Sequence, residues 1–205
     1  MELKMQTSLF LILGAIVSMV GWMFIYPADG DGSASAADNA AALMGDPGLA
    51  KVGMLLGFGG MGAMMMGFLN IARKMAAGTG LGAAFANVSG VFSLALIVVM
   101  TFLVGVEWAV VEASSAEIGT ALMQISSASE TSFMVCVGLL LLTLGIGIIV
   151  EKNYHVIIGG VAAIIGVTFL IGIVGGAADL FGFIGWIGML LTAIALGVQT
   201  LRSQS

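Results

Sequence analysis

The chain alternates between long apolar runs and short segments that hold most of its charged and turn-forming residues. A helix needs about 20 apolar residues to cross the roughly 30 Å hydrocarbon core of a bilayer. Six runs come close to this length or exceed it, covering residues 8–26, 49–72, 81–106, 132–150, 156–174 and 180–201. A helix is the only open-ended element that satisfies its own backbone in lipid. The pattern therefore predicts an all-α, polytopic integral membrane protein, with residues 1–205 forming a single bundle of six transmembrane helices.

The composition supports a lipid environment. Of the 205 residues, 60% are hydrophobic and only 8% are charged, whereas a soluble domain carries about 25% charged residues. The net charge of −5 comes without the clustered Lys and Arg that nucleic-acid binding requires. We therefore expect the lipid bilayer as a partner, and neither a soluble enzyme nor a nucleic-acid binder.

The basic residues predict how the bundle is oriented. Five of the six fall on the same side of the predicted spans, and these are Lys4, Arg73, Lys74, Lys152 and Arg202. Lys51 alone falls on the other side, together with most of the acidic residues. Basic residues concentrate in cytoplasmic segments, so both termini are predicted to be cytoplasmic. The expected location is a membrane of the prokaryotic cytoplasmic type.

The first apolar run has an alternative interpretation as a signal peptide. Lys4 would supply its basic start, and residues 34–36 have the small-x-small form of a cleavage site. However, the apolar run is longer than the usual apolar core of a signal peptide, and the cleavage site lies well beyond its end. A retained first helix is therefore the expectation.

Two longer connections, 27–48 and 107–131, are predicted on the outer side. In the first, Ser35 can cap a short helix that extends to Met44 and is ended by residues 45–47. Such a segment is compatible with an acidic cap over the bundle and also with a plain solvated connector.

The second connection contains Ile118, Leu122 and Ile125 at positions i, i+4 and i+7. This spacing predicts one or two turns of amphipathic helix lying on the membrane surface.

Glycines in the second span share one helical face. Gly53, Gly57, Gly60 and Gly67 are separated by 4, 3 and 7 residues, which aligns them at about 100° per residue. Small residues at this spacing let helix backbones approach closely. We expect packing against a neighbouring helix of the same chain, with a dimerisation seam as the alternative.

Four polar residues form a candidate polar path. Asn87 and Thr101 lie in the third span, and Glu107 and Asp179 lie at the outer ends of their spans. Polar groups at such depths face protein or water more often than lipid. The alternative is that Asn87 and Thr101 bond across helices, while Glu107 and Asp179 are ordinary interfacial acids. No predicted span carries an ionisable residue near its middle, as pumps usually do.

Candidate cofactor ligands are few. The single histidine, His155, and the single cysteine, Cys136, provide neither a bis-histidine haem site nor a multi-cysteine metal site. Met61 and Met65 are four residues apart, and thioethers suit Cu(I). This pair resembles the M-x-x-x-M element of high-affinity copper transporters, but their three-span architecture and Met/His-rich tail are missing. We expect these methionines to fill gaps beside glycine, and we expect no cofactor.

Catalytic motifs are missing from the sequence. It contains no P-loop, G-x-S-x-G, H-E-x-x-H or C-x-x-C pattern, so no catalytic residue is assigned. The expected function is that of a non-enzymatic accessory or structural subunit, which packs with other membrane subunits or with itself in a larger complex. The alternative is a passive channel or facilitator for a small solute or ion.

Overall fold

Helices account for the secondary structure of the described part of the chain. The computed structural model describes residues 3–28, 34–174 and 178–202, and for residues 178 and 179 it describes the backbone alone. Its helices are α1 (Leu3–Val20), the π-helical turn η1 (Gly21–Ile25), α2 (Ala36–Gly45), α3 (Pro47–Ala76), α4 (Leu81–Val111), α5 (Ala116–Glu151), α6 (Val156–Val174) and α7 (Ala178–Arg202). Six of them are long and apolar enough to cross a membrane. The predicted all-helical fold with six candidate spans is confirmed at this level.

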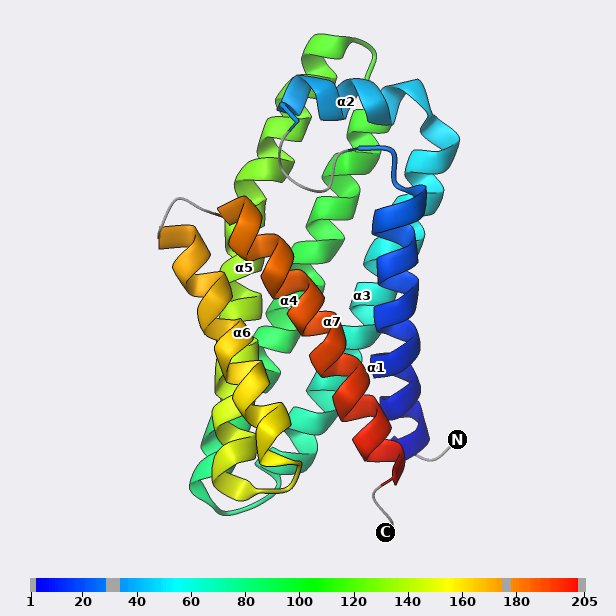
Figure 1. The fold of residues 1–205 in the computed structure, drawn as a ribbon. Helices are drawn as coiled ribbons and strands as arrows, with labels where there is room; N and C mark the ends of the chain where they lie inside the picture. Colours follow the sequence, from blue (N-terminus) through cyan, green and yellow to red (C-terminus); the bar gives the residue numbers. More distant parts are fainter. Residues whose placement is uncertain (1–2, 29–33, 175–177, 203–205) are drawn as a thin grey trace.

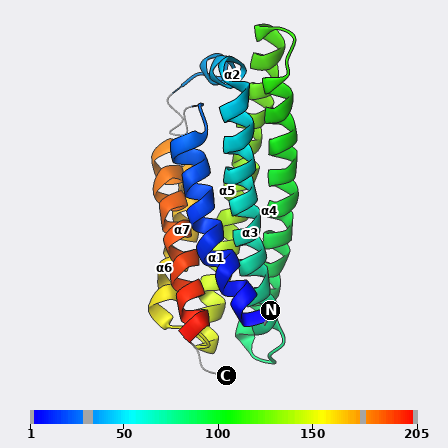
Figure 2. The ribbon, with the colours of Figure 1, turned by 90° about the vertical axis from the view of Figure 1, so that its right-hand side faces the viewer.

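The six long helices form a closed ring. α1 packs on α3, and α3, α4, α5, α6 and α7 follow in chain order until α7 returns to α1. The short helix α2 packs on α5, α4 and α3 and lies across the end of the ring opposite both chain termini (Figures 1 and 2). We call these two ends the α2 end and the terminal end.

Local capping explains α2 and the start of α3. Ser35 forms a capping box with Asp38, in which Asp38 N donates to Ser35 Oγ at 3.2 Å and Ser35 N donates to Asp38 Oδ2 at 3.3 Å. Asp46 then caps α3 by accepting from Leu49 N at 3.0 Å, with Pro47 in the first turn. The predicted short helix after Ser35 is confirmed, whereas residues 29–33 of this connection lie outside the described residues.

The predicted outer connection 107–131 is wrong. α4 continues to Val111, and α5 starts at Ala116 after the cap Ser115, whose Oγ accepts from Ile118 N at 3.3 Å. The segment has many polar residues but a single glycine and no proline, so its polarity ends the apolar run without breaking the helix. The expected surface helix at Ile118 is instead the first part of α5, and the predicted span 132–150 covers only its C-terminal half.

Close glycine contacts join α1 and η1 to α3. A Cβ built on Gly60 would lie 2.7 Å from the backbone oxygen of Gly14, and one on Gly67 would lie 2.6 Å from Leu11 Cγ. The other two glycines of the predicted face make similar approaches. A Cβ on Gly53 would lie 2.7 Å from Tyr26 Cα, and one on Gly57 would lie 2.7 Å from Trp22 Nε1. All four glycines approach residues between Leu11 and Tyr26 of the same chain.

Fully buried apolar side chains fill the ring toward the terminal end. They come from four of the helices and are Leu11, Met64, Met65, Phe68, Leu144 and Leu196. These side chains belong to one continuous apolar core, and close-packed cores of this kind leave few voids larger than a water molecule.

Candidate functional site: a central cavity beneath α2

At the α2 end the ring is hollow. A cavity of about 870 Å³ lies beneath α2. Most of its lining residues come from η1, α2, α3, α4, α5, α6 and α7. Its large apolar lining residues are Trp22, Met23, Phe58, Met61, Leu103, Met123, Phe133, Met134, Phe169, Phe183 and Trp186. Its polar lining residues are Tyr26, Asn39, Glu107, Gln124, Ser127 and Glu130. A large apolar pocket with a few converging polar groups is typical of ligand-binding sites.

The tilt of α7 opens this cavity. Near the terminal end α7 meets α1, where a Cβ on Gly197 would lie 2.7 Å from Ile12 Cγ1. Near the α2 end α7 packs on α6 instead, and a Cβ on Gly185 would lie 2.9 Å from the ring of Phe169. Figure 1 shows α7 crossing diagonally between these positions. Both η1 and the start of α7 line the cavity.

Glu107 is the buried acid of this cavity, with only 5% of its surface exposed. Its Oε2 accepts a hydrogen bond from the Tyr26 hydroxyl at 2.7 Å, and its Oε1 accepts one from Ser126 Oγ at 2.9 Å. Burying a carboxyl group is costly unless it is hydrogen-bonded. The two hydroxyl groups offset this cost and link α4 to α5 and to the end of η1.

The end of η1 positions Tyr26. The Tyr26 N–H closes the π-helical turn by donating to Gly21 O at 2.9 Å, and the residue then adopts an extended conformation. Pro27 follows, and a proline disfavours helical geometry in the residue before it. The Trp22 ring makes edge contacts with Tyr26 and Phe58, with ring centroids 4.6 and 4.7 Å apart. Single π-helical turns occur frequently at functional sites.

The charges lining the cavity have one sign. Among the described lining residues, Glu107 and Glu130 are acidic and none is basic. Lys51 is engaged elsewhere, since its Nζ lies 2.8 Å from Glu112 Oε1 and 4.9 Å from the centroid of the Trp108 ring. Hydrogen bonding to Lys51 holds the pKa of Glu112 below its ordinary value.

The structure does not bring Asn87, Thr101 and Glu107 of the candidate polar path together. Glu107 faces the cavity, whereas Asn87 and Thr101 are exposed. Thr101 Oγ1 donates to Ile97 O of its own helix at 2.8 Å. The side chain of Asp179 lies outside the described residues.

Three residues of the site were missed from the sequence. Tyr26 and Ser126 bond Glu107, and Glu130 lines the cavity. Ser126 and Glu130 are four residues apart on one face of α5, a signal that is visible only when this segment is interpreted as helix.

The two methionines considered for copper are buried. Met61 lines the cavity, and Met65 belongs to the packed core beneath it. Within the described residues, no three His, Cys, Asp or Glu side chains gather as a metal site.

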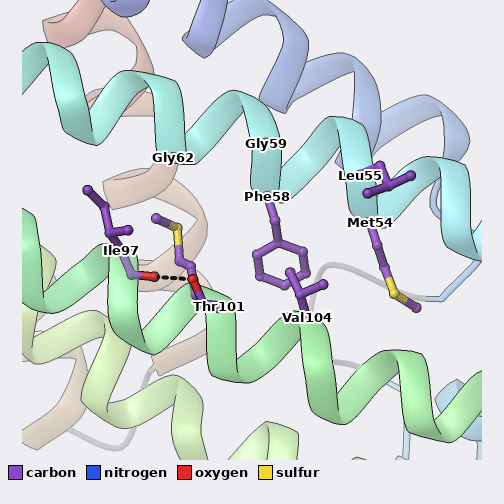
Figure 3. Close-up of a pocket in the computed structure, with 9 residues that line it drawn as sticks. Met54, Leu55, Phe58, Gly59, Gly62, Ile97, Thr101 and Val104 are labelled. Atoms are coloured by element: carbon purple, nitrogen blue, oxygen red, sulfur yellow. Dashed lines mark hydrogen bonds between the residues drawn. The ribbon is translucent and has the colours of Figure 1, made fainter.

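A shallower groove lies between α3 and α4. It measures about 250 Å³ and has the lining residues Met54, Leu55, Phe58, Gly59, Gly62, Ile97, Met100, Thr101 and Val104. Figure 3 shows Gly59 and Gly62 on α3 opposite Ile97 and Thr101 on α4. A Cβ on either glycine would meet no atom within 4 Å. No side chain of the described residues therefore covers α3 at these two glycines. We call it the α3–α4 groove.

Comparison with known proteins adds no relative. No protein-family model matches the chain, and no curated protein and no solved structure is significantly similar to it. Fold and site describe a helical bundle with six candidate membrane spans and a cavity at one end.

Proposed function

We propose that this chain is a non-enzymatic integral membrane protein that binds a small amphiphilic molecule in its central cavity. In this proposal both termini are cytoplasmic and the α2 end faces the other side of a prokaryotic cytoplasmic membrane. The observation that carries it is the cavity itself, with a hydrogen-bonded carboxyl group among aromatic and aliphatic walls. Within a membrane span, an ionisable residue that faces the bundle interior marks a functional site by default.

The lining is itself amphiphilic. Asn39 comes from α2, and Gln124 and Glu130 come from the N-terminal half of α5. Met61 and Phe169 are buried members of the apolar core, and Trp186 packs against that core. A ligand with a polar head toward α2 and an apolar body toward the bundle core complements this arrangement.

A passive channel receives less support. The ring is closed toward the terminal end by Phe68, Leu144 and Leu196, whose side chains are fully buried. A solute path through the bundle would require these side chains to move apart. Binding from the α2 end or from the bilayer requires no such change.

The proposal is tested by native mass spectrometry of protein purified in mild detergent. Gly182 lines the cavity, and a Cβ there would have Met134 Cε as its nearest neighbour at 3.5 Å. Gly182→Phe therefore places an aromatic ring inside the cavity, whereas Gly160→Phe is a matched control at a position where a Cβ would meet nothing within 4 Å. We expect wild type and Gly160→Phe to retain a small molecule that Gly182→Phe loses. Equal retention by both variants, or no retained molecule in any sample, would contradict the proposal.

The α3–α4 groove supports a second candidate function, that of an accessory subunit in a larger membrane complex. Small residues at a helix surface let a further helix approach closely, and Gly59 and Gly62 have open space above them. We expect Gly62→Phe to lose stoichiometric subunits that co-purify with wild type and with Gly160→Phe. Co-purified subunits are identified by mass spectrometry, and a lone wild-type monomer would contradict this candidate.

A further inference from the structure

The walls and the charges of the central cavity together select one kind of ligand. Seven aromatic side chains line it, namely Trp22, Tyr26, Phe58, Phe133, Phe169, Phe183 and Trp186. Among the described lining residues, the only charged side chains are the two carboxylates. Aromatic faces attract cations, and a carboxylate shielded from water attracts a cation more strongly than an exposed one does.

We propose that the ligand is an organic cation, a protonated amine or a quaternary ammonium group attached to an apolar body. This inference rests on the proposed function, because it specifies what the cavity binds. The charged head lies toward Glu107 and Glu130, and the apolar body lies against the aromatic walls.

Glu107 is prepared to act as the counter-ion. Each of its oxygens accepts one hydrogen bond within the protein, from Tyr26 and from Ser126. A carboxylate oxygen has two lone pairs, so each oxygen retains one for a ligand. Because the two hydroxyl groups already fix the carboxyl group, binding does not have to order it, and such preorganisation favours affinity.

Anions and neutral molecules meet a different environment. An anion would meet two carboxylates without a basic residue among the described lining positions. A neutral molecule would gain the apolar contacts but no attraction to Glu107. The proposal therefore predicts a strict order of affinity among probes of similar shape.

The test uses three such probes on the full chain in neutral-lipid nanodiscs. Binding of labelled tetraphenylphosphonium is measured by equilibrium dialysis, with empty nanodiscs subtracted. Tetraphenylborate, of nearly the same shape and opposite charge, and neutral triphenylphosphine oxide are each measured separately in the same way. We expect saturable binding of the cation at one site per chain, weaker binding of the neutral probe and no saturable binding of the anion.

Variants locate the charge. Glu107→Gln is expected to weaken binding of the cation by about tenfold or more, and the exposed Glu130→Gln is expected to weaken it less. Glu117 is an exposed acidic residue of α5, the helix that carries Glu130, and it does not line the cavity. Glu117→Gln is therefore the matched control and should bind the cation like wild type. If Glu107→Gln fails to fold, Glu130→Gln decides alone, because its position is exposed.

The outcomes separate this inference from the proposed function. If the three probes bind equally and Gly182→Phe abolishes all three, the cavity binds ligands but the cation assignment is overturned. The same holds if neither glutamate variant changes binding of the cation. If no probe binds saturably, or if Gly182→Phe has no effect, the cavity is not a binding site and the proposed function fails.

Discussion

The two halves of the bundle are built on opposite principles. Toward the terminal end, the helices make close glycine contacts and pack fully buried side chains between them, as at Gly67 and Phe68. Toward the α2 end, the same helices separate around a cavity of about 870 Å³, where hydrogen bonds to Glu107 link them. We therefore expect the terminal end to supply most of the stability of the fold, while the α2 end holds a cavity and a buried acid.

The largest expected effect comes from truncating one phenylalanine in each half. Phe68 is fully buried, whereas Phe183 lines the cavity and is 47% exposed. We expect Phe68→Ala to lower the free energy of unfolding by about 3–5 kcal/mol, as for buried aromatic residues elsewhere. Phe183→Ala should cost about 1 kcal/mol or less, because it removes few contacts. Denaturant titration in mixed micelles measures both, and equal losses would break the comparison.

A pair of glycines tests the contact between α1 and α3 next. Gly60→Ala would press a methyl group onto the backbone of Gly14, which cannot rotate away. We expect a loss of about 2–3 kcal/mol, the usual range for overpacking. Gly62→Ala, two residues along the same helix, meets open space and should be neutral or stabilising, because alanine favours helix. Thermal unfolding of both variants provides the measurement, and similar melting temperatures would show that α1 and α3 are not in tight contact.

The hollow half should depend on hydrogen bonds. Tyr26→Phe keeps the ring contacts of Tyr26 but removes its donor to Glu107 Oε2. Leaving a buried polar group with one partner fewer should cost about 1–2 kcal/mol. Ser127→Ala changes an exposed lining residue beside Ser126 and serves as the control, with little change expected. If Tyr26→Phe unfolds like wild type, the hydrogen bonds to Glu107 do not hold the α2 end together.

The smallest effect is expected at the ion pair between Lys51 and Glu112, on the outside of the α2 end. Because Lys51 lowers the pKa of Glu112, the pair contributes stability above the ordinary glutamate pKa of about 4.3 and loses it as the pH falls through the lowered value. Glu112→Gln should therefore melt slightly below wild type at pH 7, and the difference should disappear in strong acid. A difference that persists or grows on acidification would contradict this assignment.

Hydropathy alone predicted the six candidate spans, because crossing a bilayer imposes length and apolarity on each helix. Ser35 and the residues after it predicted α2, because capping depends on residues close together in the chain. These features are local, and a single sequence displays them directly.

The site could not be predicted in the same way. The hydrogen bond from Tyr26 to Glu107 joins residues 81 positions apart, and no local sequence pattern predicts such a long-range contact. The polar residues of α5 near Ser126 were interpreted as a loop, because a hydropathy criterion assigns polar segments to positions outside the membrane. In the folded ring, Ser126 donates a hydrogen bond to Glu107, so a polar residue of this segment faces the interior of the bundle.

Oxidation of methionines by hydroxyl radicals tests the contrast between the two halves most directly. Met134 lines the cavity and is partly exposed, whereas Met64 and Met65 are fully buried in the packed half. Radicals generated in water oxidise accessible thioethers to sulfoxides, which mass spectrometry quantifies for each methionine. In nanodiscs we predict rapid oxidation of Met134, slowed in Gly182→Phe, with Met64 and Met65 protected in both proteins. Equal rates at the three methionines, or a rate at Met134 that Gly182→Phe leaves unchanged, would contradict a bundle that is hollow at one end and solid at the other.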